Sequence, residues 1–159
     1  MYKLILLDVD GTLGKPKSGG DFRETADDWE FFPGRIEACQ KLVADGSKII
    51  TCSNQGGVCF SWSKFNEEQI TVVLESTAKA IGAMASLVAC SSTNAKALDR
   101  YRFDDPRRKP APGMLLEAMK MAGVSASETL MVGDRSEDQD AAKNCGVAFM
   151  WSHEFFLEK

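Results

Sequence analysis

The stretch that decides the fold is Leu4-Ile5-Leu6-Leu7-Asp8-Val9-Asp10-Gly11-Thr12-Leu13. Its first four residues form a continuous apolar run, which is typical of a strand covered on both faces. We expect this strand to span residues 3–9, with the turn residues that follow ending it. Asp8 and Asp10 are two residues apart on an extended chain, so their side chains point to the same side. The sequence therefore predicts a pair of carboxylates at the end of a buried strand.

The rest of the chain alternates short apolar runs with helical patterns. The apolar runs predict further strands at 48–52, 86–90, 129–132 and 147–151. Apolar residues at three-to-four spacing predict helices at 33–46, 66–81, 112–122 and 136–145. Residues 14–28 are interpreted as a polar loop and 91–108 as irregular. This order predicts a single α/β domain over residues 1–159. We expect a doubly wound (Rossmann-like) parallel sheet of about five strands with helices on both faces and no sizeable cap domain.

Composition limits the chemistry that this chain can perform. The 159 residues include one His and five Cys, and the net charge is −4. The cysteines are odd in number and contain no C-x-x-C, which argues against a disulfide framework or a Cys/His zinc site and favours a cytoplasmic protein. No apolar run approaches the ~20 residues of a bilayer span, and no signal peptide is evident. The acidic balance weakens a nucleic-acid-coating role. Any catalysis must then depend on carboxylates.

Polar residues follow the ends of several predicted strands. Ser53 and Asn54 follow the second strand, and Asp134 follows the fourth. Because the carboxyl ends of parallel strands lie at one edge of the sheet, we expect Asp134 to join Asp8 and Asp10 there. Three close carboxylates repel one another unless a cation neutralises them, and Mg²⁺ prefers such oxygen ligands. The sequence therefore predicts a Mg²⁺ site at this edge.

Groups suited to an anion are expected near the same edge. Ser53 offers a hydroxyl, Gly56-Gly57 offers exposed backbone N–H groups, and Lys109 offers a fixed positive charge. Carboxylates, a divalent cation and phosphate donors together suit phosphoryl transfer, in which positioning and charge neutralisation supply most of the catalysis.

These residues resemble the four motifs of the haloacid dehalogenase (HAD) superfamily of phosphatases. The first is Asp8-Val9-Asp10-Gly11-Thr12-Leu13, the second is Ser53, the third is Lys109 within Arg-Lys-Pro-Ala-Pro-Gly-Met, and the fourth is Gly133-Asp134-Arg135-Ser136-Glu137-Asp138. They occur in order over residues 8–138. The Ser-Asn-Gln-Gly-Gly-Val and Arg-Lys-Pro-x-Pro-Gly-Met segments resemble the capless branch. That branch contains histidinol-phosphate phosphatases, heptose-bisphosphate phosphatases and the 3′-phosphatase domains of polynucleotide kinase-phosphatases.

The resemblance implies a role for each matching residue. Asp8 would be the nucleophile that forms an aspartyl-phosphate, and Asp10 would be first the general acid and then the base. Mg²⁺ would be held by Asp8, the backbone carbonyl of Asp10, and Asp134, with Asp138 supporting the site through water or Lys109. Thr12 would steady the loop. The transferring phosphoryl group would be bound by Ser53, Asn54 and Lys109.

The resemblance leaves the substrate open between a small sugar or alcohol phosphate and a polynucleotide 3′-phosphate. Arg108 is the candidate substrate contact, and together with Arg107 and Lys109 it would attract a second phosphate or a nucleic-acid backbone. Relatives of the sugar-bisphosphate and histidinol type often carry a zinc loop before the third motif. Residues 90–108 hold one Cys and no His, which argues against structural zinc. The open site is compatible with an oligomer.

Two non-enzymatic alternatives use similar residues. A receiver-like phospho-acceptor shares the doubly wound sheet, an acidic Mg²⁺ pocket, a hydroxyl residue and a Lys. Receivers, however, carry the acidic pair and the phosphoacceptor on different strands, whereas Asp8 and Asp10 share one strand end. A phosphate-binding module without catalysis is the other alternative, and the intact set of Asp8, Asp10, Lys109 and Asp134 argues against it.

Overall fold

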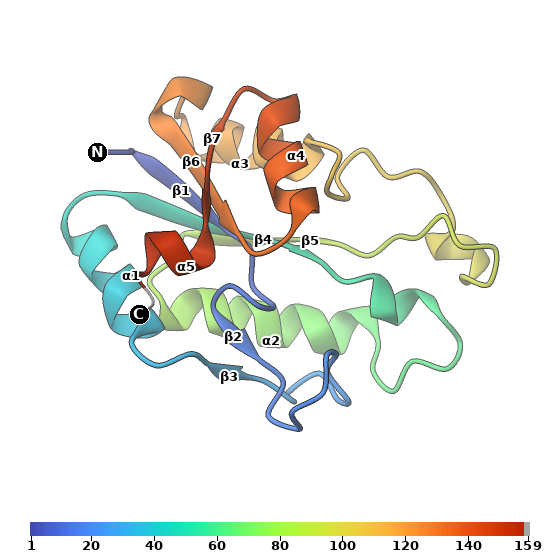
Figure 1. The fold of residues 1–159 in the computed structure, drawn as a ribbon. Helices are drawn as coiled ribbons and strands as arrows, with labels where there is room; N and C mark the ends of the chain where they lie inside the picture. The colour runs from blue at the N-terminus through green and yellow to red at the C-terminus, as the bar shows by residue number, and fades with distance from the viewer. Residues whose placement is uncertain (158–159) are drawn as a thin grey trace.

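The main sheet contains five strands that all pair in parallel, in the order β5-β4-β1-β6-β7 (Figure 1). The computed structural model describes residues 1–157, so residues 158 and 159 of the expected domain lie outside the described residues. The strands are β1 (Leu4–Leu7), β4 (Lys48–Asn54), β5 (Ala85–Ala89), β6 (Thr129–Gly133) and β7 (Ala148–Trp151). The predicted α/β parallel sheet is confirmed, with β1 at its centre.

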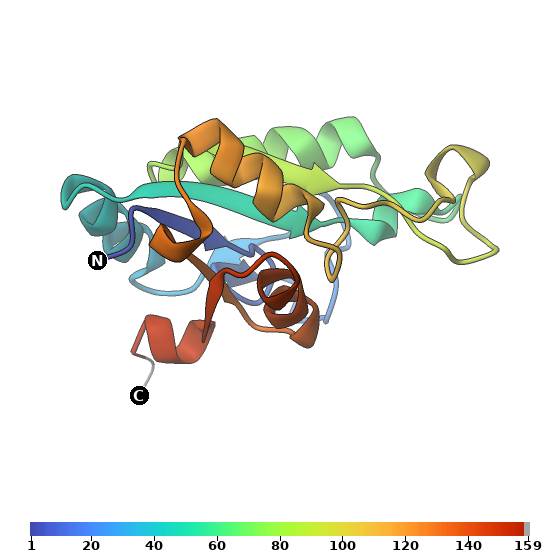
Figure 2. The ribbon, with the colours of Figure 1, turned by 90° about the horizontal axis from the view of Figure 1, so that it is seen from above.

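Helices cover both faces of this sheet (Figures 1 and 2). Alternate residues of β1 explain why its sequence is apolar throughout. Ile5 and Leu7 pack in the core beneath α1 and α2, whereas Leu4 and Leu6 pack in the core beneath α3 and α4. The helix bounds are α1 (Arg35–Ala44), α2 (Glu67–Ala80), α3 (Gly113–Ala122), α4 (Ser136–Asn144) and the short α5 (Ser152–Phe155). None of the described helices is long and apolar enough to cross a membrane.

In chain order, β4 is the second strand of the main sheet, and it runs further than the sequence predicts. β4 includes Ser53 and Asn54 because these polar residues still find partners in β5, where they pair with Val88 and Ala89. Single turns that the sequence did not predict also occur, namely η1 (Gly56–Cys59), η2 (Asp99–Tyr101), η3 (Ala126–Glu128) and the helix α5. The extension of β4 carries Ser53 and Asn54 to the same sheet edge as the end of β1.

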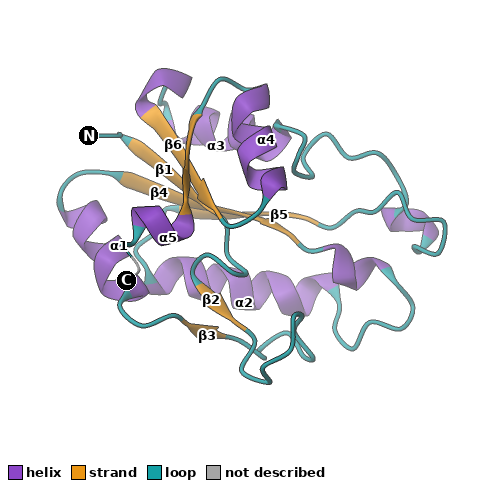
Figure 3. Cartoon of the chain, viewed as in Figure 1, coloured by secondary structure: helices purple, strands orange, loops and turns teal. Residues whose placement is uncertain are grey.

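Residues 14–28 are not the simple loop that the sequence predicts. β2 (Gly14–Lys15) pairs antiparallel with β3 (Glu30–Phe31) in a small second sheet, which Figure 3 shows apart from the main one. Gly14 allows this pairing, because a Cβ there would lie 2.0 Å from the carbonyl oxygen of Glu30. The buried Trp29 packs edge-on against Phe31, with ring centroids 4.6 Å apart. The segment is thereby fixed beside the end of β1.

Candidate active site

A cluster of three aspartates forms where β1, β6 and α4 meet. Asp8 follows β1, Asp134 follows β6 and Asp138 lies in the first turn of α4. One carboxylate oxygen of each lies within 4.8 Å of those of the other two. Gly11 permits this approach, since its φ is +86° and a Cβ there would lie 2.0 Å from Asp134 Oδ2. The expected carboxylate trio is therefore corrected, because Asp138 takes the place predicted for the side chain of Asp10.

The ammonium group of Lys109 lies inside this cluster. Its Nζ donates to Asp8 Oδ1 at 2.8 Å, to Asp138 Oδ1 at 2.6 Å and to the carbonyl oxygen of Cys52 at 2.8 Å, which uses all three of its N–H bonds. The Lys109 side chain is 2% exposed. Thr12 is also buried, and its hydroxyl donates to Asp8 Oδ2 at 3.3 Å. Both carboxylate oxygens of Asp8 therefore accept hydrogen bonds.

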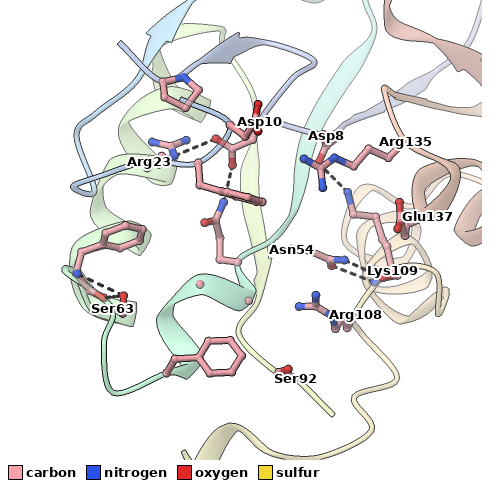
Figure 4. Close-up of a pocket in the computed structure, with 18 of the residues that line it drawn as sticks. Asp8, Asp10, Arg23, Asn54, Ser63, Ser92, Arg108, Lys109, Arg135 and Glu137 are labelled. Atoms are coloured by element: carbon pink, nitrogen blue, oxygen red, sulfur yellow. Dashed lines mark hydrogen bonds and ion pairs between the residues drawn. The ribbon is translucent and has the colours of Figure 1, made fainter. Parts of the chain in front are cut away.

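Asn54 holds the backbone of Lys109 in position. Its Nδ2 donates to the carbonyl oxygen of Lys109 at 2.8 Å, and the Lys109 N–H donates to Asn54 Oδ1 at 3.0 Å (Figure 4). This pair of hydrogen bonds connects the end of β4 to the loop before α3. The extended β4 therefore positions the lysine of the cluster.

Burial controls the ionisation of the cluster. It raises the pKa of Asp8 to about 6 in spite of the neighbouring Lys109 ammonium, and it also raises the pKa values of Asp134 and Asp138. Burial alone would lower the pKa of Lys109, but its ion pairs with Asp8 and Asp138 raise it, so the lysine is charged. With every group ionised, three carboxylates and one ammonium leave two net negative charges.

That charge and donor set fits Mg²⁺, a divalent cation that prefers oxygen ligands. The oxygens of Asp138 are already engaged, because Oδ1 accepts from Lys109 and Oδ2 accepts from the backbone N–H groups of Asp134 at 3.2 Å and Arg135 at 3.1 Å. Asp138 therefore supports the cluster through Lys109 and the turn before α4, and Asp8 and Asp134, which directly follow β1 and β6, are the candidate direct ligands.

The carboxylate of Asp10 is held by two donors that the sequence analysis missed. Arg23 Nε donates to its Oδ1 at 2.9 Å, and Gln55 Nε2 donates to its Oδ2 at 2.7 Å (Figure 4). The same Gln55 group donates to Ser53 Oγ at 2.8 Å. These contacts explain why Asp10 does not join the carboxylate cluster. No sequence pattern distinguishes Arg23 within its polar segment. Gln55 directly follows Ser53 and Asn54 at the end of a strand, so its position in the sequence could have identified it as a site residue.

A cavity of about 870 Å³ opens beside Asp8 and Asp10. Arg108 lies on its wall, and the Arg108 Nη1 donates to the carbonyl oxygen of Ser91 at 2.8 Å. Ser53 is buried and is not among the described residues that line the cavity. The residues that line the cavity come from the segment between β2 and β3, the end of β4 and the turn after it, the loop before α3, and the start of α4. They include Phe22, Arg23, Asn54, Gln55, Gly56, Gly57, Lys109, Arg135 and Glu137.

Arg107 does not share the position of Arg108. Its Nε donates to Glu117 at 2.9 Å and its Nη1 donates to the carbonyl oxygen of Val88 at 2.9 Å. The expectation that Arg107 attracts a second phosphate is therefore corrected, because its guanidinium ties α3 to β5.

Known proteins match almost the whole chain. The family model for polynucleotide kinase 3 phosphatase matches residues 3–156. The D-glycero-beta-D-manno-heptose-1,7-bisphosphate 7-phosphatase of Pasteurella multocida is 32% identical over 151 residues, covering 92% of this chain and 79% of that protein. The Escherichia coli K12 protein of the same name is 30% identical over 147 residues, covering 90% and 74%.

A solved structure shares the fold. The D,D-heptose 1.7-bisphosphate phosphatase from B. bronchiseptica, crystallised with magnesium and phosphate, aligns with a TM-score of 0.74 at 23% identity, covering 92% of this chain and 78% of that one. The resemblance seen in the four sequence motifs is confirmed by these matches. The chain therefore belongs to the polynucleotide kinase 3 phosphatase family and is a phosphatase of the capless branch of the HAD superfamily.

Proposed function

We propose that this phosphatase hydrolyses phosphomonoesters with Mg²⁺ through an aspartyl-phosphate on Asp8. The observation that carries the proposal is the cluster of buried Asp8, Asp138 and Lys109 with half-buried Asp134, which adjoins a cavity lined by Asp8 itself. A carboxylate that is held in place and accessible from a cavity can attack phosphorus, and the surrounding charges suit a phosphoryl group.

The first chemical step uses Asp8 and Asp10. A carboxylate oxygen of Asp8 attacks phosphorus in line, so that the bond between Asp8 and phosphorus forms while the bond from phosphorus to the leaving oxygen breaks. Protonated Asp10 gives its proton to that leaving oxygen, which departs as an alcohol. Arg23 and Gln55 orient the Asp10 carboxyl group for this transfer.

The second step regenerates the enzyme. Asp10, now a carboxylate, takes a proton from a water molecule whose oxygen attacks the phosphorus of the aspartyl-phosphate. The bond between phosphorus and Asp8 breaks, which releases inorganic phosphate and restores the Asp8 carboxylate. Arg23 and Gln55 hold the Asp10 carboxyl group in the same place for this step, because each donates to one of its two oxygens.

The remaining residues of the site neutralise the charge of the phosphoryl group or hold the charged groups in place. Mg²⁺ held by Asp8, Asp134 and the backbone carbonyl of Asp10 would neutralise the phosphoryl oxygens as they approach the carboxylate. Lys109 fixes Asp8 and Asp138 and brings its positive charge to the site. Ser53, Asn54 and Lys109 are the proposed contacts to the phosphoryl oxygens, and Lys109 would exchange one of its three present hydrogen bonds for a phosphoryl oxygen. Arg108 is the proposed contact to the rest of the substrate.

The proposed substrate is a small sugar or alcohol phosphate or a polynucleotide 3′-phosphate, and the similarity to heptose-bisphosphate phosphatases and to the polynucleotide kinase 3 phosphatase family supports this proposal. A phosphate-release screen tests this, using histidinol phosphate, sugar mono- and bisphosphates, nucleotides and 3′-phosphorylated DNA and RNA. We expect release with Mg²⁺, none in EDTA, and none from Asp8→Asn. Activity that persists in EDTA would overturn the metal assignment. Stable phosphorylation of the protein with negligible turnover would instead indicate the receiver-like alternative.

A further inference from the structure

Four residues that line the cavity are aromatic, and we call these four side chains its aromatic side. Phe22, from the segment between β2 and β3, and Phe60, Trp62 and Phe65, which follow η1, all line the cavity that contains Asp8 and Asp10. None of these four side chains takes part in the proposed chemistry. Their presence beside the reacting carboxylates needs another explanation.

The aromatic side has a fixed base and an open face. Phe60 and Trp62 stack with ring centroids 4.6 Å apart and an interplanar angle of 17°. Phe60 and Phe65 are partly buried and pack against the core, so the stack is anchored. Trp62 remains 62% exposed and Phe22 remains 76% exposed. Large apolar side chains gathered at a cavity and open to solvent mark a surface that a ligand covers.

The size of the cavity agrees with a ligand much larger than phosphate. Ligand cavities usually measure about 300–1,000 Å³, and this one is about 870 Å³. A hydroxylated chain can lay only its C–H groups against Phe22 and Trp62, because hydroxyl groups turned toward the rings would lose hydrogen bonds to water. A flat ring loses nothing of this kind and gains stacking contact. The aromatic side therefore favours a planar, apolar group.

We propose that the alcohol part of the substrate carries a planar aromatic ring, which stacks on Trp62 while the phosphate lies at Asp8. This inference rests on the proposed phosphatase function and narrows its substrate to small phosphomonoesters with an aryl or heterocyclic group. Trp62 is then a residue that determines specificity, and Phe22, which lines the same cavity, is a second candidate contact to the ring.

The test compares three primary alkyl phosphates with similar leaving alcohols, so that differences report binding of the distal group. These are 3-phenylpropyl, 3-cyclohexylpropyl and propyl phosphate. We expect kcat/KM to be about tenfold or more higher for the phenyl compound than for propyl phosphate, equivalent to about 1.4 kcal/mol, with the cyclohexyl compound in between. Trp62→Ala should reduce the phenyl-to-propyl ratio about tenfold, and Trp62→Phe should retain most of it.

Phe103→Ala is the matched control, because Phe103 is 48% exposed and is not among the described cavity residues. It should leave the ratio unchanged. A wild-type ratio near one, or a ratio that Trp62→Ala does not alter, would overturn the proposal even though propyl phosphate is hydrolysed.

A binding measurement separates this proposal from the phosphatase function. Calorimetric titration with 3-phenylpropylphosphonate and propylphosphonate requires no turnover. We expect the phenyl compound to bind about tenfold more tightly, and Trp62→Ala to remove that difference. If no phosphomonoester is hydrolysed, the proposed phosphatase function is wrong. The comparison of these two dissociation constants still tests whether the ring-binding site exists. Equal constants would refute it.

Discussion

Replacing Lys109 with Met removes the cation from the buried carboxylate cluster. The side chains of Lys109, Asp8 and Asp138 are 2%, 11% and 3% exposed, so water is poorly placed to replace the lost hydrogen bonds. Breaking a buried ion pair costs about 3–5 kcal/mol, because a charge is left uncompensated. Here two carboxylates lose their partner, but protonation of Asp8, whose pKa is already about 6, limits the cost. We expect the free energy of unfolding to fall by about 4 kcal/mol at pH 8 in EDTA.

Urea denaturation followed by circular dichroism at pH 8 and pH 5 measures this loss. The loss should shrink at pH 5, because the Asp8 carboxyl group, with a pKa of about 6, is then largely protonated. Lys41→Met is the control, since it breaks an ion pair to Asp45 whose side chains are 75% and 50% exposed, and should cost about 0–1 kcal/mol at either pH. A Lys109→Met loss at pH 8 no larger than this control would refute the reasoning. A variant that folds only at pH 5 would support it.

Three further predictions concern the metal, the glycine turn and Asp10. Burial raises the pKa values of the cluster carboxyls, so without Mg²⁺ stability should fall as pH rises through about 6. Mg²⁺ should then raise the Tm more at pH 8 than at pH 5, and equal shifts in thermal unfolding would contradict this. Gly11→Ala should weaken Mg²⁺ binding about tenfold or more in calorimetry, because its Cβ would displace Asp134, whereas Gly19→Ala, at φ +83° with open space, should not. Equal affinities would disprove it. Arg23→Gln should lower kcat at least about tenfold, part of the ~10²–10⁴-fold that general acid–base catalysis supplies, and Arg23→Lys should restore some of it. A kcat–pH profile unchanged from wild type would rule out a positioning role for Arg23 on Asp10.

The sequence predicted those parts of the site that depend on where strands end. Asp8 and Asp134 follow neighbouring parallel strands, so the topology alone brings them to one edge. Ser53 and Asn54 reach that edge for the same reason. The buried faces of β1 likewise followed from its apolar run. These features are local patterns combined with one rule of sheet geometry, and they need no knowledge of side-chain contacts.

The sequence could not predict contacts made by irregular segments. Alternation along a strand places Asp8 and Asp10 on one side, but the chain turns at Gly11, and Asp10 already bridges to Gly14 of the small sheet. Its partner Arg23 is positioned by tertiary contacts, including the Trp29 ring 5.2 Å from its guanidinium carbon. Such pairings depend on how a segment folds over the site, and that information is not carried by periodicity or spacing.

The central claim is that Asp8 carries the phosphoryl group during turnover. Acid quenching of the enzyme during steady-state hydrolysis of a ³²P-labelled phosphomonoester with Mg²⁺ tests it most directly. We predict a label on the protein that is stable in acid, released by hydroxylamine and located by mass spectrometry in the peptide containing Asp8. The label should be absent in Asp8→Asn and in EDTA. Turnover by the wild type with no protein-bound label, or an Asp8→Asn enzyme that still hydrolyses at the wild-type rate, would contradict the account.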